Sequence, residues 1–200
     1  MTSLTLLGDT SGSVVLDAPA VSGSTVLTLP TTTGTLALTS GLGVTEADQW
    51  RLTANITTTS SQTVLSTNWE RSDTYGAGYI GTGMTQSSGV FTFPSTGTWL
   101  IQIAAYISID GSQRYNSIGI QTTTNNSTYN DAAYASQFVS RVNSNFTVGS
   151  LYAFLIFNVT NTTNCKVRFT QACEGTAGVI GGDTNANATS ANFIRLGAST

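Results

Sequence analysis

The acidic residues Glu70 and Asp73 lie three positions apart, close enough for their carboxylates to meet in a folded protein. Most glycoside hydrolases act through such a pair, in which one carboxyl group donates a proton and the other serves as a nucleophile or a base. Spacing alone does not bring two groups together, and acidic residues in solvated loops are far more common. A polysaccharide hydrolase is therefore one hypothesis for this chain, but we predict no catalytic residue.

The segment Asp183-Thr184-Asn185-Ala186-Asn187 has the ligand spacing that opens an EF-hand calcium loop. Such a loop needs glycine at its sixth position and glutamate at its twelfth. Here those positions hold Ala188 and Ile194. We therefore interpret the segment as a polar turn, and we expect neither a metal site nor a cofactor.

Gly76, Gly78 and Gly81 match the Gly-x-Gly-x-x-Gly pattern of dinucleotide-binding proteins. That pattern binds pyrophosphate only where a strand precedes it and a helix follows it, because the helix N-terminus faces the phosphates. Residues 82–89, Thr-Gly-Met-Thr-Gln-Ser-Ser-Gly, are no helix. A glycine-rich loop is the better interpretation.

The charge composition argues against catalysis and against nucleic-acid binding. The chain has 200 residues, no His, 8% charged residues and a net charge of −3. Without His, the usual general base and the commonest metal ligand are missing. The seven Lys and Arg residues are spread from Arg51 to Arg195 without a cluster that could follow a phosphate backbone. We expect a protein that is not an enzyme and does not bind nucleic acid.

The same composition predicts an all-β fold. Thr and the aromatic residues favour pleated surfaces, while Asn, Gly and Ser favour turns. The longest apolar run, 99–109, is interrupted by Gln102 and Ser108, and the N-terminus has no basic residue. We therefore expect synthesis in a cytoplasm and no membrane insertion.

Cys165 and Cys173 bracket a single predicted strand and have the same parity. Eight residues of straight strand separate two Cα atoms by about 26 Å, far beyond the roughly 7 Å that a disulfide allows. We predict two free and mostly buried thiols, unless the strand ends before Cys173 and turns back.

The chain divides into residues 1–43 and residues 44–200. No aromatic residue precedes Trp50, and the N-terminal part offers only short apolar pieces at 4–7, 14–16, 25–29 and 35–38. Such a segment cannot close a core of its own, so it must bury its apolar residues against copies of itself or another protein. We predict an attachment segment in residues 1–40, followed by a hinge at Ser40-Gly41-Leu42-Gly43.

The larger part is predicted to be an antiparallel sandwich or jelly roll. Within 98–109 the odd positions are all apolar, which is typical of a strand with one buried face. Within 150–159 both sets of positions are apolar, so the second face needs a cover, most simply another subunit. Strands are predicted at 49–57, 62–65, 89–93, 98–109, 115–123, 133–142, 150–159, 165–172 and 192–196.

The run from Ser88 to Ile101, SGVFTFPSTGTWLI, resembles the Phe-Thr-x-Pro-x-x-Gly-x-aromatic motif of complement-head and tumour-necrosis-factor-like jelly rolls. Residues 68–71 also lie where that family has the entry to a strand. Residues 193–197 lie where it has its last strand. The resemblance implies a homotrimer with aromatic residues packed about the three-fold axis. The calcium site of many complement-head proteins has no matching carboxylate cluster here. The trimer-interface candidates are Tyr106, Tyr152, Phe154 and Ile156.

The N-terminal residues 8–19 and 28–37, GDTSGSVVLDAP and TLPTTTGTLA, are similar to a segment common in bacteriophage fibres and other virion surface proteins. The resemblance implies a protein of the virion surface. A capsid decoration protein or head fibre is slightly favoured over a tail fibre, because the chain has no long shaft repeat.

Two roles for the head remain open beside the hydrolase. It is a structural appendage, or a receptor-binding tip that recognises a host-surface glycan through loops 111–114 and 125–134. The loop tyrosines, Tyr75 and Tyr79 included, resemble those of sugar-binding surfaces, although packing at the edge of the head is the more common role of such residues. The candidate ligand-contact residues are Arg114, Asn126, Tyr129 and Tyr134.

Overall fold

The computed structural model describes residues 3–7, 10–17, 43–143, 146–175 and 178–200. They belong to two compact units, divided between Thr39 and Ser40. Within the described ranges all regular secondary structure is β-strand, which confirms the all-β prediction. No helix there is long and apolar enough to cross a membrane.

The smaller unit contains one hairpin, in which β1 (Ser3–Leu7) pairs antiparallel with β2 (Ser13–Asp17). Its side chains Leu6, Leu7 and Val15 are exposed. The strands predicted at 25–29 and 35–38, and hinge residues 40–42, lie outside the described residues.

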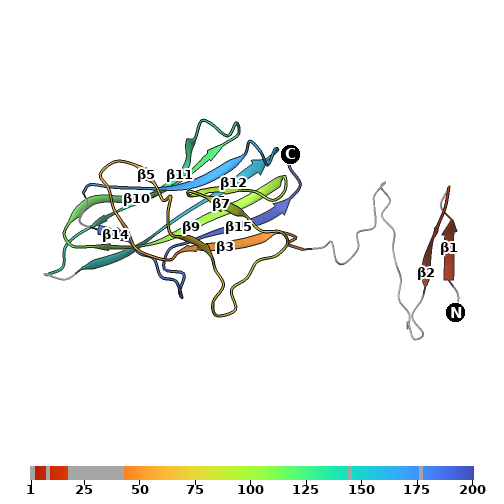
Figure 1. Cartoon of the computed structure of the whole chain (residues 1–200), viewed down its shortest axis with the longest axis horizontal. Helices are drawn as coiled ribbons and strands as arrows, with labels where there is room; N and C mark the ends of the chain where they lie inside the picture. Colours follow the sequence, from red (N-terminus) through yellow and green to blue (C-terminus); the bar gives the residue numbers. More distant parts are fainter. Residues whose placement is uncertain (1–2, 8–9, 18–42, 144–145, 176–177) are drawn as a thin grey trace. The chain divides into compact units, whose positions relative to one another are not determined.

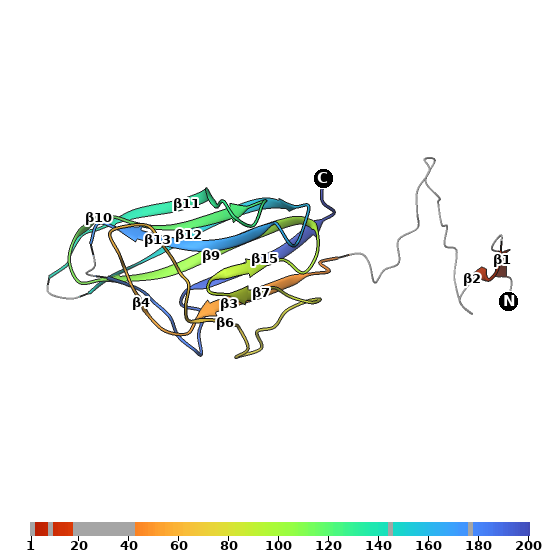
Figure 2. The same cartoon turned by 45° about the horizontal axis from the view of Figure 1, so that its top comes forward.

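The larger unit is a sandwich of two antiparallel sheets (Figures 1 and 2). In the first sheet β9 lies between β12 on one side and β15 and β14 on the other, and the sheet continues from β15 through β3 to β6. Its strands are β3 (Ala47–Leu52), β4 (Ile56–Thr57), β6 (Trp69–Arg71), β9 (Gly97–Ile109), β12 (Thr147–Val159), β14 (Gly178–Ile180) and β15 (Ser190–Gly197).

The second sheet has the order β11-β10-β13-β8-β7, with β5 also paired to β13. Strands β10, β11 and β13 lie side by side over most of their length (Figure 2). The strands are β5 (Thr63–Val64), β7 (Thr85–Ser87), β8 (Val90–Thr92), β10 (Gln113–Thr123), β11 (Asn130–Val139) and β13 (Lys166–Cys173).

Eight of the nine strands predicted in the head occur with shifted ends. The ninth prediction, one strand over 49–57, is wrong: β3 ends at Leu52 after pairing with β15 and β6, and β4 pairs separately with β14. The alternating pattern also missed β6, β7 and β14, since three residues are too few to show it, although the family resemblance of residues 68–71 did indicate a strand at β6.

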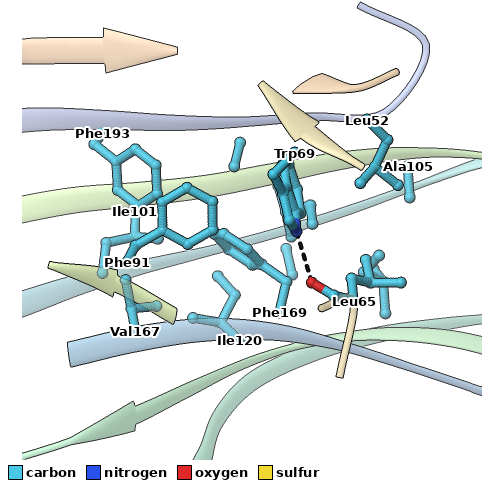
Figure 3. Packing of buried hydrophobic residues seen from close by; sticks show 14 of the residues in the cluster. Leu52, Leu65, Trp69, Phe91, Ile101, Ala105, Ile120, Val167, Phe169 and Phe193 are labelled. Atoms are coloured by element: carbon cyan, nitrogen blue, oxygen red, sulfur yellow. Dashed lines mark hydrogen bonds between the residues drawn. The ribbon is translucent and has the colours of Figure 1, made fainter. Parts of the chain in front are cut away.

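The core lies between the sheets and is built around Phe91 (Figure 3). Its ring packs edge-on against Trp69 at 5.3 Å between centroids and contacts Phe169 and Phe193 at 5.6 and 5.1 Å. Trp69 donates its indole N–H to the carbonyl of Leu65 over 2.6 Å, which satisfies this buried polar group. The odd positions of β9 from Trp99 to Ile109 are buried as predicted.

The turn from Pro94 to Gly97 requires a glycine at position 97. Gly97 has a φ of 152°, and a Cβ there would lie 2.5 Å from Nε of Arg195 and 2.6 Å from the carbonyl oxygen of Gly197. The close approach of β9 to β15 thus needs a residue without a side chain. The turn directs Phe93 and Trp99 into the core, with their rings 5.3 Å apart.

The two cysteines are free and buried, as predicted. Strand β13 runs straight through to Cys173 and does not turn back. The distance along the strand therefore keeps the thiols apart.

Candidate functional site

The outer face of β12 is apolar and uncovered. The strand alternates: the odd positions from Leu151 to Val159 face the core, with Leu155 and Phe157 partly buried against it, while the even positions point outward. Within the described ranges β12 pairs with β9 alone, so its other backbone edge is open. We call its outward side chains, together with Tyr106 of β9, the apolar face: Val148 (57% exposed), Tyr152 (66%), Phe154 (70%) and Ile156 (64%).

The structure places all four predicted interface residues on this face. Tyr152, Phe154 and Ile156 lie opposite Ala104, Gln102 and Leu100 of β9, and Tyr106 lies opposite Ser150. A hollow of about 210 Å³ lies among Gln102, Ala104, Tyr152, Phe154 and Asn192. Tyr106 is the least exposed of the four, because its ring packs against Gly181.

The acidic pair Glu70 and Asp73 is brought together, but by a buried arginine. Arg51 donates from Nε to Glu70 over 2.8 Å and from Nη2 to Asp73 over 2.6 Å. Burial works against the charge of Arg51, but hydrogen bonds to the two carboxylates outweigh it and raise the pKa of the guanidinium above its ordinary value. Both carboxylates are thus partners of one cation and not a free acid and base pair.

A second buried ionic group, centred on Asp48, was missed by the sequence analysis. Its carboxylate accepts hydrogen bonds from Arg71 over 3.0 Å, from the indole N–H of Trp50 over 2.9 Å and from the amide of Met84 over 2.7 Å. The Arg71 guanidinium also lies 4.5 Å from the ring centroid of Tyr79. These contacts fix the glycine-rich loop 76–83, which leads into β7 and not into a helix.

Every Lys and Arg side chain of the protein has a partner within the head. Lys166 donates to the carbonyl of Thr162, and Arg195 donates to the carbonyl of Thr96. The Lys and Arg side chains therefore anchor loops and strand ends of the head. The other partners are Glu70 and Asp73 for Arg51, Asp48 for Arg71, Glu174 for Arg114, Asp110 for Arg141 and Gln121 for Arg168.

The polar segment that begins at Asp183 forms a turn held by its own backbone. Oδ1 of Asp183 accepts hydrogen bonds from the amides of Asn185 over 2.6 Å and Ala186 over 3.1 Å. The described part of the chain contains no group of three or more His, Cys, Asp or Glu residues that could hold a metal ion.

The four predicted ligand-contact residues do not form one site. Arg114 pairs with Glu174 near the start of β10, whereas Asn126 and Tyr129 lie in the connection after its end. The 11 residues of β10 separate these ends by about 33 Å, ten steps of roughly 3.3 Å. Tyr134 belongs to β11 and not to a loop.

Tyr129 is held by Arg168, whose guanidinium lies 3.9 Å from the ring centroid. Burial raises the pKa of Tyr129 above its ordinary value, and the nearby positive charge of Arg168 opposes that rise. The pair links the connection between β10 and β11 to strand β13.

No protein-family model and no curated protein matches this sequence. Among solved structures, Eiger TNF from S. frugiperda matches with a TM-score of 0.56 and 10% identity, over 77% of this chain and 94% of that chain. Murine APRIL at pH 5.0 matches with a TM-score of 0.52 and 8% identity, over 76% of this chain and 98% of that chain. PRD1 vertex protein P5 superposes less closely, with a TM-score of 0.46 and 14% identity over 77% and 99%. The first two likenesses show that this chain has a jelly roll of the tumour-necrosis-factor type.

Proposed function

We propose that this protein is a structural component of a bacteriophage particle, a homotrimeric surface appendage. Residues 1–43 attach it to another virion protein, and the jelly-roll head of residues 44–200 faces outward. The observation that carries this proposal is the apolar face on β12. The described residues offer it no cover within the chain.

Covering the apolar face has a clear energetic benefit. Burying one large apolar side chain contributes about 1.5–3 kcal/mol, and the face presents Val148, Tyr152, Phe154 and Ile156 in one row. A contiguous exposed patch of this kind usually marks an interface between proteins. A closed ring of identical copies buries the apolar face of every copy and leaves none of them exposed.

Three copies are proposed because of the fold. The motif from Ser88 to Ile101 resembles that of trimeric jelly rolls, and the head has the jelly-roll fold that this resemblance implies. The apolar face lies on a single sheet, as aromatic packing about a three-fold axis requires.

The N-terminal hairpin suits an attachment role. A two-stranded hairpin alone is marginally stable, and this one exposes Leu6, Leu7 and Val15. Such side chains are buried when the hairpin joins a partner. The sequence similarity of residues 8–19 and 28–37 to phage fibre segments supports a virion protein as that partner.

Labelling intact phage particles with an antibody against the head tests this function. Electron microscopy should show label on the particle surface, and its position distinguishes a capsid decoration from a tail fibre. Purified particles without the protein would contradict the proposal.

A second function, recognition of a host-surface glycan, is favoured by a different observation. A polar hollow with an exposed tyrosine lies on the outer face of the second sheet. The arrangement of the residues around this hollow defines a specific candidate site for the glycan.

A further inference from the structure

The outer face of β11, β10 and β13 is organised in three rows of residues that run across the strands. In the middle row Gly119 lies between Tyr134 and Thr170. One flanking row is Asp131, Gln121 and Arg168, and the other is Ser136, Ser117 and Ala172.

Gly119 forms the floor of a hollow in this face. Its missing side chain leaves a depression of about 190 Å³, lined by Gln62, Asp131, Tyr134 and Thr170 among others. A Cβ at position 119 would lie 2.6 Å from Oγ1 of Thr170, so no larger residue fits without displacing that wall. The volume is below the roughly 300 Å³ of a typical drug-sized site, which limits the occupant to about one ring.

A β-bulge brings Asp131 and Tyr134 to the same face. Residues three apart on a regular strand point in opposite directions. The register shifts between Ile120 and Gln121, so that Ile120 pairs with Ala133 while Gln121 pairs with Asp131. The extra residue in β11 turns the carboxylate toward the hollow beside the tyrosine ring.

The polar groups at the hollow are held in fixed orientations. Arg168 donates to Oε1 of Gln121 over 2.7 Å, which leaves the amide nitrogen of Gln121 to donate to Oδ1 of Asp131 over 2.9 Å. Gln62 donates to the same Oδ1 over 2.9 Å. Among the described residues both bonds end on Oδ1, so Oδ2 of Asp131 can accept from a ligand.

We propose that this hollow binds one pyranose ring of a neutral saccharide. Tyr134, 76% exposed, offers a flat apolar surface to the C–H face of the ring, while the carboxylate of Asp131 accepts from hydroxyl groups. Arg168 is already engaged by Gln121 and Tyr129, so a phosphate or sulfate would find no free cation here. The proposal deepens the glycan-recognition function and requires no particular oligomeric state.

Saturation-transfer NMR on the full chain tests the site, with methyl glycosides of glucose, galactose, mannose, rhamnose, N-acetylglucosamine and N-acetylgalactosamine as probes. We expect at least one glycoside to receive saturation at its ring protons. Tyr134→Ala should weaken its binding about two- to twelvefold, which corresponds to the roughly 0.5–1.5 kcal/mol of an aromatic contact. Asp131→Asn should weaken it as well, because the amide nitrogen cannot accept.

Phe138→Ala is the matched control, since Phe138 is an aromatic residue of the same strand, is as exposed as Tyr134 and does not line the hollow. It should leave binding unchanged. No transfer to any of the six glycosides, or transfer that Tyr134→Ala does not reduce, would overturn the site. Neither result would affect the trimer or the position on the particle, which are measured separately.

Discussion

Tyr152 on β12 lies directly opposite Ala104 on β9. Because the alanine side chain is small, the tyrosine ring is exposed beside a hollow on the outer face of the first sheet. The same strand buries Leu151 and Ala153 in the core. One strand thus carries two apolar faces, of which the described residues cover one. The proposed assembly follows from this arrangement.

Gly97→Ala should destabilise the head by at least about 2 kcal/mol. The new methyl group meets Arg195 and a backbone carbonyl, and alanine disfavours the φ of 152°. Urea unfolding monitored by fluorescence measures the loss. Gly78→Ala is the control: nothing lies within 4 Å of its Cβ position, and its φ is not positive. Equal stability of the two variants would contradict the argument about the turn.

Phe91→Ala should lower the free energy of unfolding by about 3–5 kcal/mol. Its ring contacts the rings of Trp50, Trp69, Phe169 and Phe193, so the substitution leaves a cavity at the centre of the core. Thermal unfolding by circular dichroism detects the change. Phe138→Ala, on the exposed side of β11, should alter stability by no more than about 0.5 kcal/mol. A small effect at Phe91 would mean that this core is packed differently.

Glu174 should titrate below the ordinary carboxyl value of 4.5. Hydrogen bonds from the backbone amide and then the side chain of Arg114 favour its charged form and lower its pKa. The pKa of Glu174 is thus lower in the folded protein than in the unfolded chain. Its bonds to Arg114 therefore stabilise the fold at pH values above the unfolded pKa, and this stabilisation disappears as the pH falls through the folded pKa. Glu174→Gln should therefore lower Tm at neutral pH and have no effect in acid. A 13C NMR midpoint at or above 4.5 would contradict this.

Both thiols should be unreactive in the native protein. Cys165 and Cys173 are fully buried, so a thiol reagent such as dithionitrobenzoate should label neither until urea unfolds the chain, when it labels two. Rapid labelling of either residue without denaturant is the result that this packing does not allow.

Much of the head could be predicted from periodicity. The strict alternation in β9 and the two apolar sets in β12 indicate which faces these strands bury, because burial acts on every second residue of a strand. The three-residue strands β6, β7 and β14 carry no such pattern. They form because longer strands provide backbone partners, which is tertiary information.

The polar hollow could not be predicted in the same way. Tyr134 was singled out as an aromatic among polar residues, but its neighbours depend on register: Gly119 is opposite it only in this pairing, and Asp131 joins them through a bulge. Arg114 and Asn126 share loop-like sequence character, yet β10 holds them at opposite ends. Likewise, nothing in the spacing of Glu70 and Asp73 showed that Arg51 lies between them.

The mass of the full chain in solution tests the proposed assembly most directly. Size-exclusion chromatography with light scattering should give three times the chain mass of 20.8 kDa. The double variant Tyr152→Asp, Phe154→Asp should give the single-chain mass, whereas Tyr75→Asp, near the opposite edge of the same sheet, should remain trimeric. A stable wild-type monomer of 20.8 kDa would contradict the account.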